Sequence, residues 1–332
     1  FCNTSLFELG KQIVHDEVLG ICGVCGKGII FISSLIFPDI PINNEIKKAP
    51  EEAYAVFIGD IHFGSKHFLQ EDFDAFLKWI KGEAGNEEQK KIIEKVKYLF
   101  ILGDAVEGVG IYPDQENDLE ITDIKEQYKL LSEFLSQLPS HIKVIICPGN
   151  HDAMRISEPQ PAMNNEFIEA LVNLNNVIIV SNPSVVKIMH SNDFDGLTVL
   201  LYHGFSFPYY ADKVEPIRLL GGQKKPEEIM KFLLLKRHLA PTHTSTLYLP
   251  DENQDFLVIK EIPDIFASGH IHRVSVDNYK NVTLLNCSSW LKMSDYQKKV
   301  GLFPQPSRAI VVNLQTRNVK IMNFATGDVQ DG

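Results

Sequence analysis

The chain has 332 residues, of which 44% are hydrophobic, and a formal net charge of −11 at pH 7. This is the composition of a globular protein, and no apolar run reaches the ~18–20 residues that a membrane helix needs, which excludes an integral membrane protein built of helices. The acidic balance argues against tight DNA binding by this chain alone, because a free-standing nucleic-acid-binding domain normally presents a basic face.

Residues 1–50 differ in pattern from the rest of the chain. Short β-like runs at 1–7, 13–18, 20–25 and 28–37 alternate with Gly-rich turns, and prolines punctuate 38–50. Small β segments with glycine corners predict the C-terminal part of an OB-like β domain followed by a linker. A hairpin packed on the main domain is the alternative. Because the sequence starts at Phe1 rather than at Met, we expect a fragment of a longer chain.

The five cysteines are few and show no framework spacing, which indicates a reducing, intracellular setting. Cys22 and Cys25 resemble half a zinc knuckle, but no second pair of ligands completes a four-ligand site. We therefore favour a free dithiol or a strained turn over zinc.

From Tyr54 onward strands and helices alternate. A strand at 54–58 precedes helices at 70–81 and 87–97, and strands ending at 102 and 147 flank a helix at 121–138, with another helix at 164–174. With right-handed crossovers this order predicts a parallel sheet. The C-terminal half is mixed, with helices at 212–221 and 226–237 and strands at 177–180, 184–190, 197–202, 256–260, 264–268, 274–276, 282–286, 308–314 and 318–324. We predict a mixed α/β domain over 51–332, a two-sheet β-sandwich flanked by helices.

Five of the strands end in Gly beside Asp, Asn or His. The clusters present, in chain order, Asp60 and His62; Asp104; Asn150, His151 and Asp152; His203; and His270 and His272. Glycine lets the backbone turn sharply and approach a ligand closely. Each cluster alone is more often a turn or a surface group, but their recurrence at apolar strand ends favours one shared site.

Two Asp, one Asn and four His side chains, without a thiolate, form a ligand set that suits Mn, Fe or Zn. Seven ligands are too many for one tetrahedral ion and suit two ions with a bridging carboxylate. Two ions ~3.5–4 Å apart can clamp a phosphate and activate a water for in-line attack.

The motifs GDIHFG, GDAVEG, GNHD, HG and GHIH, in this order within residues 54–290, resemble those of the calcineurin-like metallophosphoesterase superfamily. The resemblance implies one metal on Asp60, His62 and His272 and a second on Asn150, His203 and His270, with Asp104 bridging. It implies that His151 protonates the leaving oxygen and that Asp152 orients His151 or its loop.

A narrower resemblance lies between the motifs. Segments 108–128, 234–243 and 261–273 look like the small subunit of the archaeal family-D DNA polymerase. That family couples a phosphoesterase domain to a preceding OB-fold domain and acts as a 3′–5′ exonuclease beside a large polymerising subunit. Its eukaryotic relatives have lost most metal ligands, whereas this chain keeps every motif position, which favours an active enzyme.

The resemblance also sets expectations about cofactors, partners and location. We expect two divalent ions, manganese first, with iron or zinc as alternatives. The expected partners are the polymerase large subunit, a DNA 3′ end as substrate and the sliding clamp. The expected location is the archaeal cytoplasm, with the nucleoid. A protein or small-molecule metallophosphatase and a non-catalytic scaffold subunit remain alternatives on the same motifs.

Four further residues are candidates near the site. Arg155 could contact a substrate phosphate or form a loop salt bridge. His67 could line the entrance, and Tyr209 could stack a base, although aromatic residues there more often pack internally. Glu107 could accept a hydrogen bond from a ligand, but we favour an exposed side chain.

Overall fold

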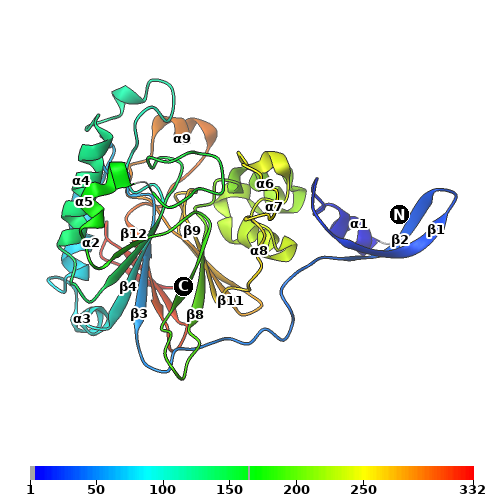
Figure 1. Cartoon of the computed structure of the whole chain (residues 1–332), viewed down its shortest axis with the longest axis horizontal. Coiled ribbons are helices and arrows are strands. Elements are labelled where there is room, and N and C mark those ends of the chain that lie inside the picture. The colour runs from blue at the N-terminus through cyan, green and yellow to red at the C-terminus, as the bar shows by residue number, and fades with distance from the viewer. Residues whose placement is uncertain (1–3, 164) are drawn as a thin grey trace.

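The computed structural model describes residues 4–163 and 165–332 and consists of two sheets packed face to face between helices, with an N-terminal segment projecting from one side (Figure 1). The seven-stranded sheet has the order β14-β13-β12-β3-β4-β5-β6, and the five-stranded sheet β10-β11-β9-β8-β7. This confirms the predicted sandwich flanked by helices.

The first sheet has a parallel half, made of β3 Tyr54–Ile58, β4 Val96–Leu102, β5 Lys143–Cys147 and β6 Val177–Ile179. Its antiparallel half is made of β12 Arg308–Asn313, β13 Val319–Asn323 and β14 Val329–Asp331. In the second sheet β8 Leu197–Leu201, β9 Ile265–Ser268 and β11 Val282–Asn286 run parallel, between the antiparallel edges β7 Ser184–Ile188 and β10 Ser275–Tyr279. The core strands are apolar on both sides because each sheet is covered on both faces.

Three buried clusters correspond to the three interfaces between layers. Between the sheets, Phe57 of β3 and Phe100 of β4 stack at 4.6 Å, against residues that include Leu201 and Ala267. On the outer face of the first sheet lie α2 Gln70–Ile80, α3 Glu87–Ile93, α4 Ile124–Ser136 and α5 Asn165–Val172. On the outer face of the second lie α6 Phe207–Lys213, α7 Glu215–Leu220 and α8 Pro226–Lys236. Helix α9, Asp295–Val300, and the short 3₁₀ turns η1 Gln115–Asn117, η2 Gly222–Lys224 and η3 His243–Ser245 lie in connections.

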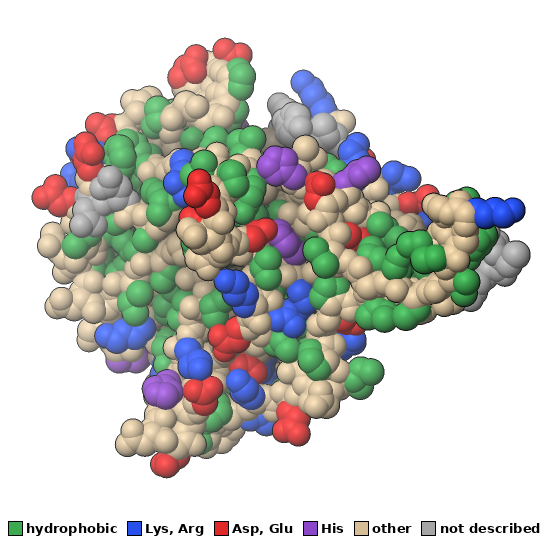
Figure 2. All heavy atoms as spheres, turned by 45° about the vertical axis from the view of Figure 1, so that its right-hand side comes forward, with side chains coloured by type: hydrophobic (Ala, Val, Ile, Leu, Met, Phe, Trp, Pro, Cys, Tyr) green, Lys and Arg blue, Asp and Glu red, His purple; other side chains and the backbone are tan. Residues whose placement is uncertain are grey.

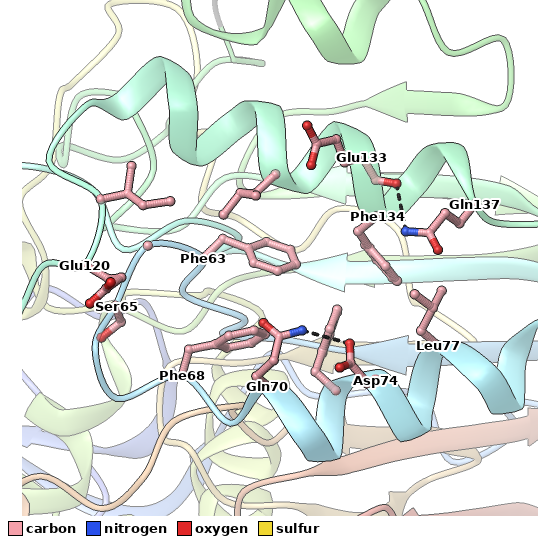
Figure 3. A pocket seen from close by; sticks show the side chains of 14 residues that line it. Phe63, Ser65, Phe68, Gln70, Asp74, Leu77, Glu120, Glu133, Phe134 and Gln137 are labelled. Carbon is pink, nitrogen blue, oxygen red and sulfur yellow. Dashed lines mark hydrogen bonds between the residues drawn. The ribbon is translucent and has the colours of Figure 1, made fainter.

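Helices α2 and α4 leave a pocket of about 260 Å³ between them (Figure 3). Phe63, Phe68 and Phe134 point into it, with Asp74 and Glu133 at its edge. The residues that line it include none of the candidate metal ligands.

Several predicted elements were wrong. Residues 4–10 form α1, Thr4–Gly10, rather than a strand, with Leu6 as its buried residue, while residues 1–3 of the predicted first run lie outside the described part. Segment 13–18 is a loop. Segment 256–260 buries Leu257 and Ile259 in alternation, as a strand would, but bonds only briefly to residues 237–239 and therefore forms no strand. The helix predicted to reach 97 ends at Ile93, because the chain enters β4 at Val96; β14 and α9 were not predicted.

The N-terminal strands β1 Gly20–Gly26 and β2 Ile29–Ile36 form a hairpin, and within the described residues they pair with each other alone. Hydrophobic side chains cover much of this projecting end (Figure 2). The segment is anchored by a buried ion pair between Glu17 and Lys236 and by Asp39, which bonds Lys280 and Tyr279. The predicted strands at 20–25 and 28–37 are confirmed; the OB-like domain that they would complete stays a prediction.

No helix in the described part of the chain combines the length and apolarity that crossing a membrane requires.

Candidate metal centre

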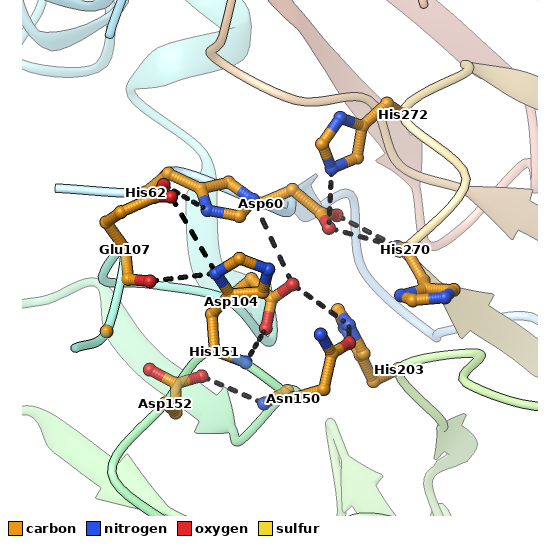
Figure 4. A network of polar contacts seen from close by, with 12 residues as sticks. Asp60, His62, Asp104, Glu107, Asn150, His151, Asp152, His203, His270 and His272 are labelled. Atoms are coloured by element: carbon orange, nitrogen blue, oxygen red, sulfur yellow. Dashed lines mark hydrogen bonds and ion pairs between the residues drawn. The ribbon is translucent and has the colours of Figure 1, made fainter. Parts of the chain in front are cut away.

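The seven candidate ligands lie together where strands of both sheets end. The loops after β3, β4 and β5 and those after β8 and β9 meet at one edge of the sandwich, and their side chains converge around Asp60 and Asp104 (Figure 4). Parallel strands present their carboxyl ends on one edge of a sheet, which explains why five separated motifs meet.

The backbone at this edge is unusual. Asp60, His62, Asp104, His270 and His272 all have positive φ, between 47° and 67°, although none is glycine. Residues held in this sparsely populated region cluster at functional sites, where the surrounding structure over-determines them.

Two glycines make the close approach of the loops possible. A Cβ at Gly149 would lie 2.2 Å from Asp104 Oδ1, and one at Gly269 would lie 2.5 Å from Asp60 Oδ2. Any side chain at either position would therefore displace a candidate metal-binding carboxylate.

The first ligand group is Asp60, His62 and His272, whose ligand atoms lie within 4.8 Å of one another. His272 Nε2 is 3.4 Å from Asp60 Oδ1, and the backbone N–H of His270 donates to both oxygens of Asp60. The carboxylate is thus fixed by the neighbouring loop and faces the histidines.

The second group is Asp104, His203 and His270, also within 4.8 Å, with Asn150 beside it. His203 Nε2 is 3.3 Å from Asp104 Oδ2 and 3.0 Å from Asn150 Oδ1. His203 Nδ1 lies 2.7 Å from the carbonyl oxygen of Leu102. Since a carbonyl only accepts, Nδ1 carries the proton and Nε2 is left to bind a metal.

The residues fit a pair of divalent ions. His62 Nε2 is buried without a hydrogen-bond partner among the described residues, and its nearest carboxylate oxygen, on Asp104, is 3.9 Å away. A buried, unpartnered imidazole nitrogen is costly unless something binds it. Asp104 lies between His62 and His203, one from each ligand group, so it is placed to serve both.

His151 belongs to neither of these two groups, but with His62 and Glu107 it forms a third set whose possible ligand atoms lie within 4.8 Å of one another. Its ring is edge-on to that of His62 at 4.7 Å, and its Nδ1 is 2.8 Å from the carbonyl oxygen of Glu107. Its backbone N–H donates to Asp104 Oδ1 at 2.8 Å. Nδ1 must therefore donate to the carbonyl, which leaves Nε2 to give or take a proton.

Asp152 holds the loop and does not contact the ring of His151. Its carboxylate accepts from the backbone N–H of Gly149 at 2.8 Å and of Ala105 at 3.4 Å, and from the hydroxyl of Tyr128 at 3.1 Å. It ties the loops after β4 and β5 together beneath the site.

Glu107 is buried, with 3% of its surface exposed, so the expectation of an exposed side chain was wrong. Its Oε2 is 2.9 Å from Nδ1 of His62, although the alignment is poor for a hydrogen bond. Tyr112 donates to Glu107 and Asp118, and Asp118 in turn contacts Nε2 of His67 at 3.3 Å. The half-exposed side chain of His67 is thus connected to His62 through a series of polar contacts that runs over Asp118, Tyr112 and Glu107. The signal in the sequence was the position of Glu107, three residues after a strand-end Asp.

A second network was missed entirely. Glu158, 1% exposed, accepts from the hydroxyls of Tyr202 at 2.9 Å and Thr246 at 2.7 Å. Asn182 donates to Glu158, and its Oδ1 accepts from the backbone N–H of His203 at 2.8 Å. Gln160 bonds Asn182 and the carbonyl oxygen of Gly149. These side chains hold the backbone of the loops that carry Asn150 and His203, but they belong to no local motif.

The remaining candidates lie further out. Arg155 is exposed and donates twice to the carbonyl oxygen of Pro159, so it forms a loop contact rather than a salt bridge. Tyr209, on α6, packs at the margin of the second core and edge-on to Tyr210 at 5.2 Å. Its ring thus serves packing in this structure.

The electrostatics of the cluster favour bound cations. Burial opposes charge on the histidines, but Glu107, Asp104 and Asp60 together outweigh it and raise the pKa of His62 to about 9; Asp104 and Asp60, with the carbonyl of Leu102, raise the pKa of His203 to about 10. Burial, reinforced by His203, lowers the pKa of His270 to about 3. Burial raises the pKa of Asp104, but His203 and His151 prevail and hold it well below its usual range. Without metal the anionic cavity therefore holds protons, which a divalent cation would displace.

Comparison with known sequences agrees with the geometry. The sequence model of the family described as calcineurin-like phosphoesterase matches residues 54–274. The chain therefore belongs to the calcineurin-like phosphoesterase family.

Two relatives carry the name DNA polymerase II small subunit. The chain is 40% identical over 304 residues to the DNA polymerase II small subunit of Archaeoglobus fulgidus, covering 92% of this chain and 60% of that one. It is 38% identical over 323 residues to the subunit of the same name from Methanothermobacter thermautotrophicus, covering 97% and 64%. The chain thus spans less than two-thirds of the length of these relatives. Among solved structures it is similar to Yfce, a phosphoesterase from E. coli, with a TM-score of 0.39 and 14% identity over 84% of this chain and 98% of that one, too remote a likeness to add to the family assignment.

Proposed function

We propose that the chain is a two-metal phosphodiesterase that removes nucleotides from the 3′ end of DNA, as the small subunit of an archaeal replicative DNA polymerase. The observation that carries the chemistry is the meeting of the Asp60, His62 and His272 group with the Asp104, His203 and His270 group, with Asp104 facing a histidine of each and His151 beside them. The names of the relatives supply the choice of DNA over other phosphate esters.

The roles of the chain's own residues follow from their contacts. Bound divalent ions, which we expect to be manganese, would supply Lewis-acid stabilisation of the phosphate and activation of a water. Asp60, His62 and His272 would hold one ion, and Asn150, His203 and His270 the other, with Asp104 serving both. His151, oriented through Nδ1 by the carbonyl of Glu107, would give the proton of Nε2 to the departing 3′ oxygen. An unpaired 3′ end is the natural substrate, because it reaches a recessed site without the cost of melting a duplex.

The acidic net charge is consistent with DNA binding that is shared with a partner subunit. A net charge of −11 argues against tight DNA binding by this chain alone, so we propose that the large polymerase subunit supplies a basic surface for DNA. The sliding clamp is a further proposed partner, and the cytoplasm, with the nucleoid, the proposed place of action.

The test is degradation of single-stranded DNA labelled at its 3′ or 5′ end, with Mn²⁺ or EDTA. We expect Mn²⁺-dependent release of mononucleotides from the 3′ end, lost in His151→Ala and retained in His141→Ala, which alters an exposed histidine before β5. Faster turnover of a phosphoprotein or a phosphomonoester than of DNA would instead indicate a phosphatase. Intact metal binding without cleavage, even with the large subunit present, would indicate a non-catalytic scaffold.

A further inference from the structure

The surface beside His151 is hollowed into a pocket of about 510 Å³, which we call the Met154 pocket. Its lining includes Val109, Ile111, Met154 and Phe167, with His151 and Arg155. Residues of the candidate site, His151 and Asp152, line this pocket, whereas four other pockets in the described part of the chain contain none of them.

The pocket lies next to the candidate metal centre, because its lining includes His151 but none of the seven candidate metal ligands. One side of His151 is taken up by the site: its ring is 4.7 Å from that of His62, its Nδ1 contacts Glu107, and its backbone N–H donates to Asp104. The pocket is lined by His151 together with the residues that follow it, through Arg155. A group bound there would therefore lie against the residue that we propose to protonate the leaving oxygen.

The walls are chemically suited to a nucleobase. Val109 and Ile111 come from the loop after β4, Met154 from the loop after β5 and Phe167 from α5, and the volume lies in the range of ligand sites. Apolar and aromatic walls accept the face of any base, and methionine adapts to different shapes. Arg155, the only Lys or Arg in the lining, is exposed and could contact a phosphate on the sugar that carries that base.

The chemistry decides which base it would be. We infer that the Met154 pocket binds the base of the penultimate nucleotide, the one whose 3′ oxygen leaves; this rests on the proposed function. In that reaction the oxygen of water bonds to phosphorus, and the bond from phosphorus to the 3′ oxygen breaks. The 3′ oxygen takes the proton of His151, the water loses its proton to solvent, and the terminal nucleotide departs as a 5′-monophosphate. The leaving-group side is thus the side of His151, and the penultimate nucleoside lies there.

The test uses single strands that lack one base, at either the terminal or the penultimate nucleotide. Stacking of a base contributes ~1–3 kcal/mol, so removal of the penultimate base should slow 3′ release by about 5-fold to 150-fold, and removal of the terminal base should have a smaller effect. Val109→Trp, at a side chain 46% exposed, should fill the pocket without harming the fold. It should slow digestion of the intact strand and abolish the difference between intact and penultimate-abasic strands.

Val185→Trp is the matched control, because Val185 is 51% exposed and lines a different pocket that contains none of the candidate ligands. It should behave as the unaltered chain does. The affinity for Mn²⁺ should be unchanged in Val109→Trp, which separates a filled pocket from a disturbed metal centre.

Three results would overturn the inference: an abasic effect confined to the terminal nucleotide, no abasic effect at all, or an undiminished penultimate effect in Val109→Trp. Failure of the proposed function looks different, because the unaltered chain would then release no mononucleotide from intact DNA under any metal condition, and the inference would fall with it.

Discussion

The substitution Glu107→Gln tests how the buried carboxylate supports the metal centre. Glu107 lies 2.9 Å from Nδ1 of His62, and its side chain is nearly inaccessible to water. Glutamine keeps the size of the side chain but removes its charge and replaces one oxygen with an NH₂ group, which only donates hydrogen bonds. If that group faces His62, Nδ1 must accept, and Nε2 then carries the proton and cannot bind a metal. If the amide oxygen faces His62, the charge is still lost.

The expected magnitude follows from the contact. Partners that hold a metal-binding histidine typically contribute 10-fold to 100-fold in metal affinity or activity, which corresponds to ~1.4–2.7 kcal/mol. That range agrees with the ~1.5–3 kcal/mol of a hydrogen bond to a charged group. We therefore expect one of two Mn²⁺ sites to weaken 10-fold to 100-fold in Glu107→Gln, while the site that contains His203 keeps its affinity.

Isothermal titration with Mn²⁺, paired with hydrolysis of bis-p-nitrophenyl phosphate, measures both effects. Glu116→Gln, an exposed position in the same loop, is the control and should bind two ions as the unaltered chain does. If Glu107→Gln binds both ions with unchanged affinity and hydrolyses the diester at an unchanged rate, Glu107 serves only the fold and the assignment is wrong.

Three further predictions follow from the same contacts. His151→Ala should slow hydrolysis of DNA, whose 3′ oxygen is a poor leaving group, about 10²-fold to 10⁴-fold with unchanged Mn²⁺ affinity, because the bond to Asp104 comes from its backbone; a parallel loss of metal would contradict this. Removing metal with EDTA should lower the melting temperature by roughly 5–10 °C relative to Mn²⁺ at 100 times its dissociation constant, and Asp104→Asn should show a much smaller difference. Burial raises the pKa of Glu158 from 4.5 to about 7, so the folded chain binds the extra proton between these values and loses stability as pH rises through them. Glu158→Gln in EDTA should remove that loss, on the order of 3 kcal/mol by urea unfolding at pH 4.5 and 7.5. The exposed control Glu252→Gln should keep the loss, and the same pH dependence of stability in both variants would refute the prediction.

The sequence predicted the layers and the meeting of the ligand loops because both depend on local patterns. Continuous apolar runs such as 54–58 marked strands covered on both faces, and Gly beside Asp or His marked their ends. Once the strands are known to be parallel, the convergence of Asp60 and Asp104 follows from topology alone.

What the sequence did not reveal depends on contacts between distant residues. Glu158 and Asn182 lie in loops without a motif, and only the folded chain shows that they support His203. Segment 256–260 alternates as a strand does, but a strand needs a partner of matching length, which alternation cannot report. The Met154 pocket is likewise assembled from four segments whose apolar residues predict only packing.

Anomalous diffraction from crystals grown with Mn²⁺ would test the central claim most directly. We expect two peaks ~3.5–4 Å apart, one beside His62 and His272 and the other beside His203 and His270, with Asp104 contacting both. A single peak, or no peak within reach of Asp104, would contradict a two-metal centre and with it the proposed hydrolysis of DNA.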